Sequence, residues 1–136
     1  MKIFTATLIV LLSANSFASF SQELRFSTVT SQAFVQDPND STGWFAVDKA
    51  YDFNSELIIL EDRSAIVHIT EDSTSIYLVQ GISYNQLDDI TTYQVQSNTG
   101  KYYHFNYDKP KNLFAVTYEN SDNQISMNYI RLEPEK

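Results

Sequence analysis

Residues 101–132 read KYYHFNYDKPKNLFAVTYENSDNQISMNYIRL, a stretch that contains three short runs of apolar and β-branched residues. The runs cover residues 101–107, 113–118 and 124–132. Polar clusters rich in Asp, Asn, Ser and Lys separate them, which is typical of β-strands joined by turns. Because a parallel pair of strands needs a long crossover, connections this short predict antiparallel neighbours.

Alternation within these runs predicts which face of the sheet is buried. One set of alternate positions is aromatic or apolar: Tyr103, Phe105, Tyr107, Phe114, Val116, Tyr118, Ile125, Met127 and Tyr129. The intervening positions are mostly small or polar: Tyr102, His104, Asn106, Ala115, Thr117, Ser126 and Asn128. We therefore expect the first set to point into a core and the second set to form the wetter face.

The same pattern extends toward the amino terminus through residues 57–60, 65–70, 75–84 and 90–96, with an earlier run at residues 24–30. Eight runs with hairpin-length links predict an all-β domain, an antiparallel meander of about eight strands. Such a meander closes as an up-and-down barrel or stacks as a two-sheet sandwich. We favour the barrel because closure removes exposed strand edges.

Residues 41–53 fit two kinds of element. Trp44, Val47 and Tyr51 recur at helical spacing, whereas Trp, Phe and Val side chains favour strands. The sequence leaves both a short helix and a strand open here.

The amino terminus has the features of a secretory signal. Lys2 precedes the apolar run of residues 3–12, and the small residues Ser16 and Ala18 fit a signal peptidase that cleaves after Ala18. The apolar run is shorter than the ~17 residues that span a bilayer. The prediction is a signal peptide at residues 1–18 and a single β domain at residues 19–136, periplasmic or secreted, with no transmembrane segment after signal removal.

Composition narrows the possible partners. The chain has 9 basic and 17 acidic residues and a net charge of −8, so repulsion of phosphate argues against nucleic acid. It has no cysteine, which excludes disulfides and lipid attachment at a cysteine. Stability must then come from burial and backbone pairing alone.

The motifs of common enzyme classes are missing from the sequence. There is no G-x-S-x-G and no cysteine nucleophile, and the three glycines are too scattered to form a phosphate-binding loop. Residues 37–43 fit an ordinary turn better than a calcium loop. We predict no catalytic residues, no metal site and no cofactor, while His68 and His104 are the available imidazoles.

Aromatic residues make up 14% of the chain, which is its most unusual feature. Tyrosine and tryptophan combine rigid apolar area with a polar tip, which suits ligand surfaces as well as barrel cores. As ligand-binding candidates at a barrel mouth we select Trp44, Tyr51, Tyr102 and His104.

The stretch of residues 44–53, followed by Leu57-Ile58-Ile59-Leu60 and a hairpin series, resembles small exported bacterial β-meander proteins of uncharacterised function. The resemblance implies an exported β-meander and supplies no activity. The leading hypothesis is a noncatalytic module that binds a small ligand or an envelope protein. The alternatives are a small exported hydrolase that uses carboxylates, and an envelope structural or inhibitor protein.

Overall fold

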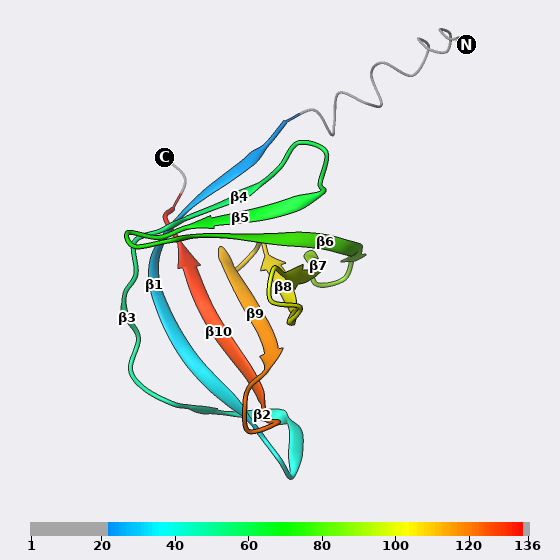
Figure 1. The fold of residues 1–136 in the computed structure, drawn as a ribbon. Helices are drawn as coiled ribbons and strands as arrows, with labels where there is room; N and C mark the ends of the chain where they lie inside the picture. The colour runs from blue at the N-terminus through cyan, green and yellow to red at the C-terminus, as the bar shows by residue number, and fades with distance from the viewer. Residues whose placement is uncertain (1–21, 135–136) are drawn as a thin grey trace, which may run out of the picture.

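The computed structural model describes residues 22–134, which form ten β-strands and no helix (Figure 1). The strands are β1 (Leu24–Asp37), β2 (Asp40–Ala46), β3 (Tyr51–Asp52), β4 (Glu56–Ile59), β5 (Ala65–Ile69), β6 (Thr74–Asn85), β7 (Ile90–Ser97), β8 (Tyr102–Asp108), β9 (Leu113–Glu119) and β10 (Ile125–Leu132). Within residues 22–134, no helix is present that would cross a membrane. The expected signal peptide at residues 1–18 lies outside the described residues.

Eight of the strands close into an antiparallel barrel. The order is β4-β5-β6-β7-β8-β9-β10, and β1 pairs with both ends of this series. Residues 24–27 of β1 pair with β4, whereas residues 28–35 pair with β10, so one long strand closes the ring. Figure 1 shows β1 and β10 running side by side as long curved strands. The barrel predicted from the hairpin spacing is confirmed.

Residues 41–53, which fitted either a helix or a strand, form β2, a connection and the short β3. Both strands pair with β1: Trp44 lies opposite Gln36, and Tyr51 lies opposite Ser31. Beyond its pairing with β4, this edge of β1 has free backbone N–H and C=O groups, and β2 and β3 pair with them. A short helix without such support is only marginally stable.

Turn residues with positive φ link the meander. Arg63, Asp89, Asn112 and Asn123 have φ between 53° and 62°, and Gly100 has φ 89°. Each of them lies in a hairpin connection, where Asn, Asp and Gly adopt this conformation at low cost.

Arg63 is the exception by residue type, and its contacts compensate for the strained turn. The guanidinium donates hydrogen bonds to the carbonyl oxygens of Gln22 and Leu60, at 2.8 and 3.0 Å. At the same end of the barrel, the Glu133 amide donates to the Ser27 carbonyl at 2.8 Å. The bonds of Gln22 and Glu133 hold both ends of the described chain to this end of the barrel.

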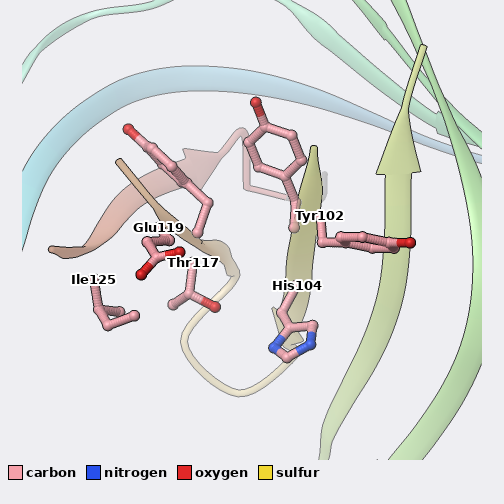
Figure 2. Close-up of a pocket in the computed structure, with 7 residues that line it drawn as sticks. Tyr102, His104, Thr117, Glu119 and Ile125 are labelled. Atoms are coloured by element: carbon pink, nitrogen blue, oxygen red, sulfur yellow. The ribbon is translucent and has the colours of Figure 1, made fainter. Parts of the chain in front are cut away.

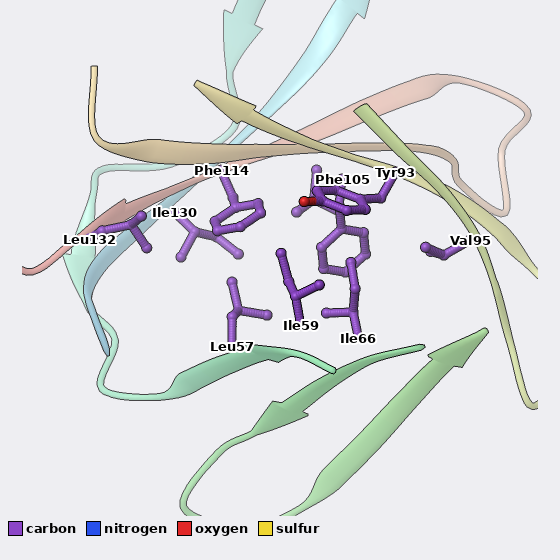
Figure 3. Close-up of a cluster of buried hydrophobic side chains, with 10 residues drawn as sticks. Leu57, Ile59, Ile66, Tyr93, Val95, Phe105, Phe114, Ile130 and Leu132 are labelled. Carbon is purple, nitrogen blue, oxygen red and sulfur yellow. The ribbon is translucent and has the colours of Figure 1, made fainter. Parts of the chain in front are cut away.

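The hydrophobic core fills the half of the barrel next to the Arg63 turn. Figure 3 shows Leu57, Ile59 and Ile66 pointing from β4 and β5 toward Phe105 and Phe114 on the opposite wall. Phe114 is fully buried, and its ring lies 5.2 Å from that of Phe26, centroid to centroid. Burying one such side chain stabilises the fold by about 1.5–3 kcal/mol.

The predicted inward face holds for β8 and β9 but is wrong for β10. Ile130 and Leu132 belong to the core, so Ser126 and Asn128 point inward, and Met127 and Tyr129 lie on the outer face. Cross-strand partners share a face, and Ile130 lies opposite the buried Phe114. Because β10 carries apolar residues on both faces, alternation alone did not fix its orientation.

Candidate functional site

A half-enclosed cavity of about 350 Å³ occupies the other half of the barrel. Its lining comes from six barrel strands, from Lys101 directly before β8, and from the segment around β3. The lining residues are Ser31, Tyr51, Phe53, His68, Tyr77, Lys101, Tyr103, Phe105, Val116, Tyr118, Asn128 and Ile130. The hairpins β5–β6, β7–β8 and β9–β10 lie at this end, opposite the Arg63 turn.

Small inward residues leave this space open. On β1 and β10 the inward positions at this end carry Ser31, Ala33 and Asn128, where the core end has Phe and Leu side chains. Ser31 is opposite Ile130, and Ala33 is opposite Asn128. The side chains of Ser31, Ala33 and Asn128 are too short to fill the lumen, so the barrel is packed at one end and hollow at the other.

One wall of the cavity is a row of tyrosine rings. The Tyr77 ring lies 5.3 Å from that of Tyr103, which lies 5.3 Å from that of Tyr118, all centroid to centroid. The Nζ atom of Lys101 sits over the Tyr103 and Tyr118 rings, 5.8 and 5.5 Å from their centroids. Such a cation–π contact contributes about 0.5–1 kcal/mol at an exposed position.

The second aromatic group comes from the β3 segment and β5. The Phe53 ring contacts Tyr51 at 6.2 Å and the His68 imidazole at 5.6 Å between centroids. Tyr51, one of the residues predicted from the sequence, therefore lines the cavity, although half of its surface remains exposed.

A hydrogen-bonded chain fixes this second group. The His68 Nε2 atom lies 2.9 Å from Ser55 Oγ, which lies 2.7 Å from Thr28 Oγ1. The Thr28 hydroxyl donates to the Phe53 carbonyl at 2.8 Å and accepts from the Ser55 amide at 3.0 Å. Burial lowers the pKa of His68, because desolvation disfavours the imidazolium.

A serine–histidine contact is also part of hydrolytic triads. Among residues 22–134, no carboxylate contacts the His68 ring, and no Asp or Glu lines the cavity. The acids lie mainly in turns, where Asp62 accepts hydrogen bonds from the Ser64 amide and hydroxyl. The His68–Ser55 contact therefore lacks the third, acidic member of such a triad within the described residues.

A smaller groove of about 270 Å³ lies across the ends of β8 and β9. His104, Thr117 and Glu119 contribute to it, and Figure 2 shows the Tyr102 ring turned away from Glu119 and Ile125. Tyr102 and His104 are both exposed, as predicted for the wetter face. This groove is more open than the cavity and contains a carboxylate, and Tyr103 and Tyr118 border both spaces.

The four residues selected from the sequence do not meet in one site. Tyr51 lines the cavity, Tyr102 and His104 line the outer groove, and Trp44 lies on β2 in neither. Among residues 22–134, no group of three or more His, Asp and Glu side chains is placed to hold a metal ion.

The sequence reasoning missed several cavity residues that share a simple signal. Lys101 is two positions before the inward Tyr103, and His68 is two positions after the buried Ile66. Extending each alternation by one step places both side chains on the inward face of the barrel. Tyr77 is inward by the same rule, because it lies opposite Ile66 in the β5–β6 pair.

Comparison with known proteins adds no family: no protein-family model, no curated protein and no solved structure matches this chain.

Proposed function

We propose that this chain is a noncatalytic binding protein that acts outside the cytoplasm and holds a small, largely apolar ligand in the open half of its barrel. The observation behind the proposal is the 350 Å³ cavity described above. Export rests on the signal pattern of residues 1–18.

The size and lining of the cavity support binding of a small molecule. Protein pockets for such ligands measure about 300–1,000 Å³ and combine aromatic walls with a few polar groups. Six of the lining side chains carry benzene or phenol rings, namely Tyr51, Phe53, Tyr77, Tyr103, Phe105 and Tyr118. Polar atoms of Ser31, His68, Lys101 and Asn128 supply orientation.

Titration with the fluorescent, uncharged probe N-phenyl-1-naphthylamine tests the proposal. We expect saturable binding of one molecule per chain, with a dissociation constant below about 100 μM. The variant Asn128→Trp should weaken binding about tenfold or more, because an indole at this inward position fills the cavity. The Asn128 side chain makes no hydrogen bond with residues 22–134, so the substitution leaves no partner unsatisfied.

Thr117→Trp is the matched control. Thr117 is also half-buried, and it lies on the adjacent strand β9 but faces the outer groove. The affinity of Thr117→Trp for N-phenyl-1-naphthylamine should stay within about twofold of that of the unmodified chain. The circular dichroism of both variants should show an intact fold. Equal binding by Asn128→Trp and the unmodified chain, or a selective loss in Thr117→Trp, would contradict the proposal.

A further inference from the structure

The charge around the cavity is one-sided. Its lining holds the Lys101 ammonium group and no carboxylate, in a chain that has 17 acidic and 9 basic residues. The outer groove differs, because Glu119 lies in its wall. A negatively charged ligand is therefore repelled less by the cavity than by the groove.

Lys101 is the cation best placed to meet a ligand. It lies at the cavity mouth, where the β7–β8 hairpin ends, and its ammonium group rests on the Tyr103 and Tyr118 rings. Within residues 22–134 it makes no ion pair, whereas Arg25 pairs with Glu23 and Glu56. The ammonium group therefore retains donors for an incoming anion.

The rings that hold Lys101 also offer flat apolar surface. Tyr77, Tyr103 and Tyr118 form a continuous row of ring contacts, and aromatic rings pack well against other planar groups. The Tyr77 hydroxyl is protonated at neutral pH, and burial raises its pKa further above the ordinary value of 10.0.

The net charge of −8 opposes an anionic ligand only weakly at this place. Charges beyond the Debye length of about 8 Å are largely screened at physiological salt, and the acids lie mainly in turns. A contact between the ligand and Lys101 is direct, whereas no Asp or Glu side chain lines the cavity.

We infer that the ligand is a small aromatic anion, whose planar body packs on the tyrosine row while its acidic group pairs with Lys101. This inference rests on the proposed function and specifies the ligand class of the same cavity.

Two probes that differ by a single sulfonate test it. The anion 1-anilinonaphthalene-8-sulfonate has the skeleton of the neutral N-phenyl-1-naphthylamine. The unmodified chain should bind the sulfonate about five- to tenfold more tightly than the neutral probe, and in Lys101→Gln the ratio of the two affinities should fall to about one. Increasing salt should weaken only the sulfonate.

Lys109→Gln is the matched control, since it removes the same charge from an exposed turn at the opposite end of β8. It should leave the preference intact. Displacement of the bound sulfonate by 1-naphthoate, but not by decanoate, would support a planar ligand. If decanoate displaced the sulfonate at least as strongly as 1-naphthoate does, the planar ligand would be overturned. If both probes bind equally in all three chains, the anion inference fails while the proposed function stands. If neither binds in the cavity, the proposed function itself fails.

Discussion

At position 68 a histidine lies on the inward face of β5, between the aromatic group of the cavity and the Ser55–Thr28 chain. A neutral imidazole fits this place, because one ring nitrogen contacts Ser55 Oγ and the ring packs on Phe53. The imidazolium form is disfavoured by burial, which lowers the pKa of His68 from its ordinary value of 6.5.

Stability should therefore depend on pH through this residue. The unfolded chain binds a proton near pH 6.5, while the folded chain resists it, so His68 contributes fully above pH 6.5 and destabilises the fold progressively below it. Thermal melts at pH 7.5 and 5.5 should show a smaller loss of Tm in His68→Gln than in the unmodified chain. The exposed His104→Gln should keep the original loss. Identical losses in all three chains would show that His68 titrates as it does in the unfolded chain.

At the scale of elements, the segment that carries β3 is held to the barrel through Thr28. This residue is buried, and its hydroxyl donates to the Phe53 carbonyl and accepts from the Ser55 amide. Its own amide donates to the Ser55 carbonyl at 3.0 Å. The β3 segment places Tyr51 and Phe53 at the cavity, so Thr28 links barrel closure to the site.

Thr28→Val keeps the shape of the side chain and removes the hydroxyl. We expect a loss of about 1–3 kcal/mol in the free energy of unfolding, because the Phe53 carbonyl and Ser55 amide lose their partner in a half-buried site. Thr30→Val, on the outer face of the same strand, should change it by less than about 0.5 kcal/mol. Urea unfolding of both variants measures the difference. Equal effects would mean that the Thr28 hydroxyl does not fasten the segment.

The strands themselves were readable from local sequence, because apolar runs and polar turn clusters mark each of β4 to β10. Two local features were not. Trp44, Val47 and Tyr51 follow helical spacing, although Trp44 and Tyr51 lie in strands. The segment forms strands because it pairs with the free edge of β1. Which face of β10 points inward depends on its register with β9, where Ile130 lies opposite Phe114. The residue pattern within β10 does not determine this register.

For the whole molecule, closure joins the first and last strands of the barrel, and the cavity is a consequence of that closure. The sequence predicted antiparallel neighbours, but the pairing of Ser31 with Ile130 joins opposite ends of the chain and has no local signal. Trp44, Tyr51, Tyr102 and His104 were selected for their chemistry, and only Tyr51 reached the cavity. Which aromatic residues meet depends on barrel geometry, which brings Tyr77, Tyr103 and Tyr118 from three strands together.

The central claim is a barrel that is solid at one end and hollow at the other, with the hollow end holding the ligand. A high-resolution crystal structure of the chain with bound N-phenyl-1-naphthylamine tests it most directly. We predict density for the ring system against the Tyr103 and Tyr118 rings, with Phe105 and Val116 forming the floor of the site. A lumen filled by inward collapse of Tyr51 or Tyr77, or a probe seated beside His104 in the outer groove, would contradict the account.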